Sequence, residues 1–189
     1  MSRRSVAILF VLAMEVLTIM YFTFGFAIFN GIRLRHIFKK KVYEGTNTKR
    51  IIGGLATGIC LSNLLTGVLF KLQYWPGANR MILLGLIPTI IVLVVIIFKL
   101  YRNKDSYYPN IQLRIAIIGT VAIILFLLPT LEIVKLQYRN KPEYIKAFEN
   151  NSLYPSDESE RKLDLEYHRA TMNAEDFKMY EEFLKNPGL

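Results

Sequence analysis

Residues 81–100 read MILLGLIPTIIVLVVIIFKL, and this stretch decides the fold, because it holds no charged residue before Lys99. A helix rises 1.5 Å per residue, so about 20 apolar residues cross the roughly 30 Å hydrocarbon core of a bilayer. Only helices and closed barrels satisfy every backbone group in lipid, and this run is too long and too continuously apolar for a barrel strand. We therefore predict a transmembrane helix at 81–100.

Three further apolar blocks lie around this one, at about residues 5–29, 51–72 and 113–136. The chain has 189 residues, of which 52% are hydrophobic, and most of its charges lie between or after the blocks. The pattern predicts an all-α membrane protein. Residues 1–136 form a region of four transmembrane helices, and residues 137–189 form a polar tail with short helices.

The first block could instead be a secretory signal peptide, because Met1-Ser2-Arg3-Arg4 resembles a charged leader. Its apolar run is long for a leader, contains Glu15, and is followed by no small-residue cleavage site. These features favour a retained helix.

Lysine and arginine in the loops predict the orientation, since cytoplasmic loops carry the excess of both. The first and third loops hold most of them: Arg33, Arg35, Lys39, Lys40, Lys41, Lys49, Arg50, Lys99, Arg102, Lys104 and Arg114. We therefore expect a multi-pass protein of the bacterial inner membrane with both termini on the periplasmic side. The net charge of +9 is then a topology signal, and no nucleic-acid partner is expected.

The sequence carries none of the motifs of soluble enzymes. Cys60 is the single cysteine, and His36 and His168 stand apart from other metal-ligating residues. Phosphate-binding glycine loops, GxSxG elbows and HExxH pairs are missing. We expect a non-enzymatic protein without a catalytic residue, cofactor or metal.

The segment at residues 67–79, GVLFKLQYWPGAN, predicts a helical hairpin. Pro76-Gly77 suits a tight turn, because proline presets one dihedral angle and glycine permits unusual ones. Trp75 is typical of the membrane–water interface, and Lys71 can reach that interface or an acidic partner. Two interpretations stay open: a membrane anchor, or a binding or coupling site at the outer mouth.

This segment resembles the transmembrane hairpin of GldL-type proteins, which serve gliding motility and type 9 secretion. In that family the pattern G-x-L-F-K-[IL]-x-H-W-P-G-A joins two membrane helices through a short periplasmic turn. The resemblance covers residues 67–85. Tyr74 replaces the family histidine, and Thr89 stands where the family has an intramembrane glutamate of its proton-driven machinery. The resemblance therefore implies the lineage and the hairpin geometry rather than a motor.

Glu15 is the acid inside the first apolar block. Intramembrane acids cost about 2.5–3.5 kcal/mol on insertion scales and usually face the bundle interior. Counting residues from the loops brings Asn63, Thr89 and Thr130 to similar depths, which predicts an intramembrane polar site for a proton, a cation or a polar head group. In the alternative interpretation Glu15 is protonated or hydrogen-bonded and only fixes packing.

Smaller patterns give local expectations. Gly54-x-x-x-Gly58 is a close-packing motif that serves the bundle or a contact between protomers. Glu132 and Lys135 have the spacing of a helical ion pair. The basic run at 33–41 either binds anionic lipid or only sets topology.

The tail contains helix boundaries. Pro142 suits a first helical turn, Ser156 precedes an acidic first turn, and Asn173 suits the cap of a last helix that ends at Pro187-Gly188. The tail is either loosely ordered or a docking module.

Together these patterns predict an envelope protein that acts by assembly. Its expected partners are the lipid bilayer and other membrane proteins or further copies of itself. The alternative is a small proton- or ion-coupled transporter with Glu15 as the acceptor.

Overall fold

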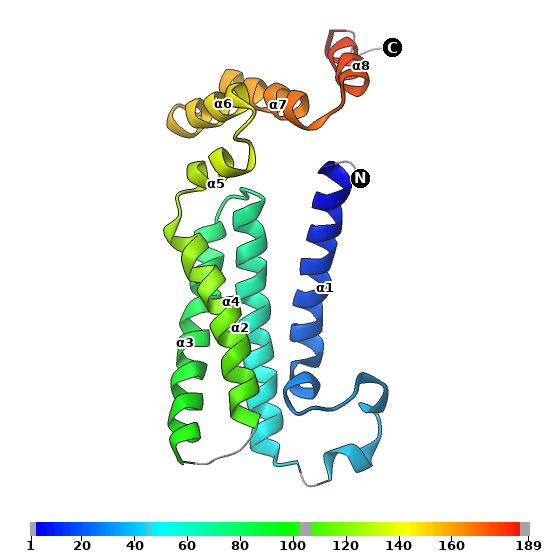
Figure 1. The fold of residues 1–189 in the computed structure, drawn as a ribbon, viewed down its shortest axis with the longest axis vertical. Coiled ribbons are helices and arrows are strands. Elements are labelled where there is room, and N and C mark those ends of the chain that lie inside the picture. Colours follow the sequence, from blue (N-terminus) through cyan, green and yellow to red (C-terminus); the bar gives the residue numbers. More distant parts are fainter. Residues whose placement is uncertain (1–2, 45, 103–106, 186–189) are drawn as a thin grey trace. The chain divides into compact units, whose positions relative to one another are not determined.

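The structure, a computed structural model, describes residues 3–44, 46–102 and 107–185. Over these residues all regular elements are helical (Figure 1). The α-helices are α1 (Arg3–Phe29), α2 (Thr48–Leu72), α3 (Ala78–Arg102), α4 (Tyr107–Leu127), α5 (Thr130–Gln137), α6 (Pro142–Leu153), α7 (Asp157–Thr171) and α8 (Ala174–Lys185); two short 3-10 helices, η1 (Leu34–His36) and η2 (Lys40–Tyr43), lie between α1 and α2.

Three helical segments of the described chain are long and apolar enough to cross a membrane, at 8–29, 48–72 and 78–99. A fourth crossing results if 111–127 and 130–137 form one broken span. The prediction of an all-α chain with apolar membrane spans is therefore confirmed at this level.

The fourth predicted helix, 113–136, is wrong as a single element, because α4 ends at Leu127 and α5 begins at Thr130. Pro129 causes the break. Proline has no amide hydrogen, its ring clashes with the carbonyl group four residues back, and it disfavours helical geometry at the preceding residue, here Leu128. Pro129 has a ψ of 143° and starts α5 as its N-cap. The chain accordingly divides into two compact units, residues 7–128 and residues 129–189 with the first six residues.

Within residues 7–128, glycines set the contact between α1 and α2. A Cβ atom on Gly25 would lie 2.6 Å from Gly58 Cα, and one on Gly54 would lie 3.1 Å from Phe26 Cα. A Cβ atom on Gly58 would overlap the carbonyl oxygen of Tyr21. The Gly54/Gly58 motif therefore packs inside the bundle, as the first of its two interpretations predicts.

Helices α2 and α3 form an antiparallel pair, with α4 packed against both (Figure 1). Glycine again permits the close approach, because a Cβ atom on Gly67 would lie 2.7 Å from Ile82 N and one on Gly85 would lie 2.6 Å from Leu64 Cα. Side chains of α2, α3 and α4 fill the space between the helices, among them Leu61, Leu64, Leu65, Val68, Ile82, Ile96, Ile111, Ile115 and Ala122.

In the tail unit the predicted helix starts are confirmed. Pro142 opens α6. Ser156 caps α7 in a reciprocal capping box with Ser159. Asn173 Oδ1 accepts a hydrogen bond from the backbone N of Asp176 at the start of α8, at 2.7 Å. The predicted stop at Pro187-Gly188 lies outside the described residues.

Candidate functional site: the α2–α3 hairpin

Lys71 is the largest buried polar side chain of the bundle. It is 2% exposed, although it lies one residue before the end of α2. Its Nζ atom donates a hydrogen bond to Asn79 Oδ1 at 2.8 Å, at the start of α3. The partner is thus an amide, and this contact links the two helices directly across their turn.

The turn itself is a Schellman ending of α2. The backbone N of Trp75 donates to the Phe70 carbonyl at 2.9 Å, and that of Tyr74 donates to the Lys71 carbonyl at 3.3 Å. The Trp75 ring packs on the Phe70 ring with centroids 4.7 Å apart. This is the apolar contact that usually accompanies such endings.

Tyr74 occupies the left-handed position that glycine usually takes in this motif, with a φ of 60°. Left-handed geometry costs an ordinary residue roughly 1–2 kcal/mol. The Schellman hydrogen bonds and the Phe70–Trp75 contact hold the turn in this form. Gly77 has a φ of 80°, which confirms the permissive role predicted for it. Trp75, Pro76 and Gly77 are exposed, with Trp75 at 51%.

The four residues of the predicted intramembrane polar site do not converge. Glu15 and Asn63 are on the exposed surface of α1 and α2. Thr89 is 2% exposed, and its hydroxyl donates to the Gly85 carbonyl of its own helix at 2.7 Å. Thr130 begins α5 and belongs to the tail unit.

Arg114 makes a contact that the sequence did not reveal. Its Nη1 atom donates to the Tyr21 hydroxyl at 2.8 Å, and its guanidinium lies 5.9 Å from the centre of the Phe29 ring. The two aromatic rings stack with centroids 5.9 Å apart. Arg114, counted above only as a loop charge, therefore joins α4 to α1.

The predicted ion pair in α5 is confirmed, since Lys135 Nζ and Glu132 Oε1 are 2.8 Å apart in a solvent-exposed position. Such exposed pairs contribute about 0–1 kcal/mol. This pair therefore has a local role.

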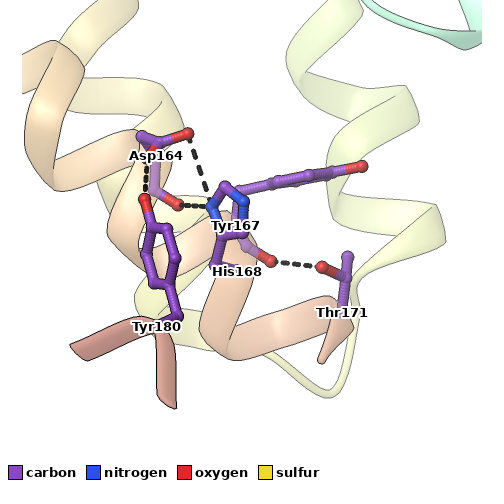
Figure 2. A network of polar contacts seen from close by, with 5 residues as sticks. All are labelled: Asp164, Tyr167, His168, Thr171 and Tyr180. Atoms are coloured by element: carbon purple, nitrogen blue, oxygen red, sulfur yellow. Dashed lines mark hydrogen bonds and ion pairs between the residues drawn. The ribbon is translucent and has the colours of Figure 1, made fainter. Parts of the chain in front are cut away.

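A polar network joins α7 and α8 in the tail (Figure 2). The Tyr180 hydroxyl donates to Asp164 Oδ2 at 2.5 Å, and the Tyr180 ring stacks on His168 with centroids 4.2 Å apart. His168 Nδ1 lies 2.9 Å from the Asp164 carbonyl oxygen, which can only accept, so this nitrogen carries the proton. The spacing of Asp164 and His168 signals a helical pair, but Tyr180 is distant in sequence.

The hydrogen bond to Asp164 raises the pKa of Tyr180, with smaller contributions from burial and from the negative charge of Asp164. Arg169 adds a second link, because its Nη2 atom lies 3.8 Å from Glu181 Oε1 and its guanidinium lies 5.3 Å from the centre of the Phe177 ring. Together these contacts dock α8 onto α7.

Among the described residues, no group of three or more histidine, cysteine or acidic side chains is arranged to hold a metal ion. Comparison with protein-family models, curated proteins and solved structures finds no match to this chain. The resemblance of residues 67–85 to the GldL-type hairpin therefore stays a prediction.

Proposed function

We propose that this chain is a non-enzymatic subunit of a membrane assembly, and that α1 is the helix through which it joins its partner. The observation that carries the proposal is the position of Glu15, which is exposed on α1 within the 22-residue candidate span at 8–29. A carboxyl group facing hydrocarbon is unfavourable by about 2.5–3.5 kcal/mol. A second helix that supplies a hydrogen-bond donor or a cation would remove this penalty.

The surroundings of Glu15 support a helix–helix contact. Ile8, Leu12, Ile19 and Phe22 are each at least half exposed. With Glu15 they follow alternating spacings of four and three residues, which place them in one stripe along the helix. That spacing is typical of helices that pack lengthwise on one another, and a single polar residue in the stripe fixes their register.

Site-directed crosslinking tests this proposal. In a Cys60→Ser background, Leu12→Cys and Ile19→Cys each place a thiol one turn from Glu15, and Met14→Cys places one against the core as the matched control. We expect a crosslinked species of discrete mass from the first two variants in native membranes and none from the third. Adding Glu15→Ala should reduce its yield.

A species of twice the chain mass identifies a second copy, and another mass identifies a different membrane protein. If neither outward thiol crosslinks above the level of Met14→Cys, the proposal fails.

The alternative proposal is a proton- or ion-coupled unit with Glu15 as the acceptor. It has less support, because Thr89 bonds its own helix and Asn63 faces outward. A pH-dependent flux in liposomes that Glu15→Gln abolishes would favour it over assembly.

We also propose the inner membrane as the location and the periplasmic side for both termini. The distribution of loop lysine and arginine supports this orientation.

A further inference from the structure

The segment between α1 and α2 presents an aromatic side chain to the surroundings in the middle of a basic run. Phe38 is 96% exposed, and Leu34 beside it is 43% exposed. The neighbouring exposed cations are Arg33, Arg35, Lys39, Lys40 and Lys41. Burying a phenylalanine side chain is worth about 1.5–3 kcal/mol, so its full exposure here is unfavourable unless an apolar phase receives it.

The segment is folded, and its folding directs Phe38 outward. Phe38 lies between η1 and η2, where the backbone N of Lys39 donates to the His36 carbonyl at 2.9 Å. The Tyr43 hydroxyl donates to the Ile37 carbonyl at 2.6 Å. These bonds tie both sides of Phe38 to the segment, so little conformational freedom remains to be lost on binding.

The segment also starts and ends at the membrane boundary. The candidate span in α1 ends at Phe29, and the candidate span in α2 begins at Thr48. Asn30 Nδ2 donates to the Arg50 carbonyl at 3.4 Å and holds the two ends together. A short segment that leaves and re-enters a bilayer in this way lies at the level of the lipid head groups (Figure 1).

From these observations we propose that residues 33–41 form a binding site for the anionic lipid surface. Phe38 inserts between the head groups, and the surrounding lysines and arginines bind lipid phosphate. A topology determinant requires only the charges. The exposed phenylalanine points to the additional role, since an aromatic ring beside a cluster of cations is the combination that binds anionic bilayers.

The test is depth-dependent fluorescence quenching of the full chain in vesicles. Trp75 is the only tryptophan, so Trp75→Phe with Phe38→Trp gives a single indole at position 38. The vesicles contain phosphatidylcholine alone or phosphatidylcholine with phosphatidylglycerol, and the quenchers are lipids brominated at shallow or deep positions and aqueous iodide. We expect strong quenching by the shallow bromines, little by iodide, and greater quenching when phosphatidylglycerol is present.

The charge contribution is isolated with two variants of equal charge. Lys39→Gln/Lys40→Gln/Lys41→Gln should lower the preference for phosphatidylglycerol at least about tenfold, because each lysine near an anionic surface contributes about fivefold. Arg139→Gln/Lys141→Gln/Lys146→Gln removes three exposed tail cations and should leave this preference unchanged.

Full accessibility of the indole to iodide in anionic vesicles would overturn the proposal. So would shielding from both iodide and brominated lipid, which would indicate a protein contact, or equal effects of the two triple variants.

Discussion

Asn79 shows how much one side chain contributes to the hairpin. It accepts a hydrogen bond from the buried ammonium group of Lys71, and bonds to charged groups contribute about 1.5–3 kcal/mol. Asn79→Ala should therefore destabilise the bundle by about that amount. Cys60, the half-buried single cysteine of α2, provides the measurement through the rate of thiol labelling during thermal unfolding in detergent.

The double variant Lys71→Met/Asn79→Leu is the control for this prediction. Replacing both partners by apolar side chains of similar size leaves no polar group unsatisfied and is nearly neutral. Unchanged labelling in Asn79→Ala would show that the contact with Lys71 does not stabilise the hairpin.

Tyr180 predicts a pH dependence in the tail. Its hydrogen bond to Asp164 raises its pKa above the ordinary value of about 10. The folded tail therefore holds this proton more tightly than the unfolded chain. Its contribution to the docking of α8 is complete below the ordinary pKa and disappears as the pH rises through the higher folded value.

We expect proteolysis within α8 to accelerate over this alkaline range in the native chain. In Tyr180→Phe the rate should lose that dependence, whereas Tyr154→Phe, which removes an exposed tail tyrosine, should retain it. Identical alkaline profiles for the native chain and Tyr180→Phe would contradict the assignment.

At the scale of helices, glycine contacts determine where α1 meets α2. Gly58→Ala would place a methyl group against the Tyr21 carbonyl and 2.8 Å from Gly25 Cα. Such overpacking costs about 1–3 kcal/mol, and both neighbours are backbone atoms, so we expect α1 to separate from α2. Unfolding followed by Cys60 labelling should begin at a lower temperature.

Gly119→Ala in α4 is the matched control, because no atom lies within 4 Å of a Cβ atom built there. It should be neutral or stabilising by up to about 1 kcal/mol, since alanine favours helix over glycine. Equal destabilisation by the two substitutions would show that helix propensity, and not the α1–α2 contact, sets the effect.

The sequence predicted those helical features that depend on local chemistry. Pro142, Ser156 and Asn173 act on backbone groups within one turn, so their positions alone located the starts of α6, α7 and α8. Hydropathy gave the spans but missed the break at Pro129, because Pro88 lies inside α3 without ending it. The polar sequence that follows Pro129 is the difference between the two.

The candidate site was only partly predictable. Lys71 and Gly77 followed from interface chemistry and turn geometry, but the Asn79 contact depends on how the turn brings α3 back. The direction of Glu15 could not be read from the sequence. A helix that is apolar all round has no amphipathic face to separate the inside from the outside.

At the scale of the whole molecule, the proposed orientation gives a direct prediction. Four crossings return the chain to its starting side, so alkaline phosphatase fused after Leu189 should be active, and a fluorescent protein at the same point should be dark. A fusion in the loop at 103–106 should give the opposite result and serves as the control. A fluorescent fusion after Leu189 would reverse the orientation.

The unequal lengths of the two connections around α2 have a consequence for biogenesis. The turn from α2 to α3 is short and internally bonded, so these two helices meet with little loop-closure entropy. The connection from α1 is much longer and must close before Gly25 can reach Gly58. During synthesis α2 and α3 therefore pair soon after both have emerged, and α1 waits beside the insertion machinery until that pair offers it a surface.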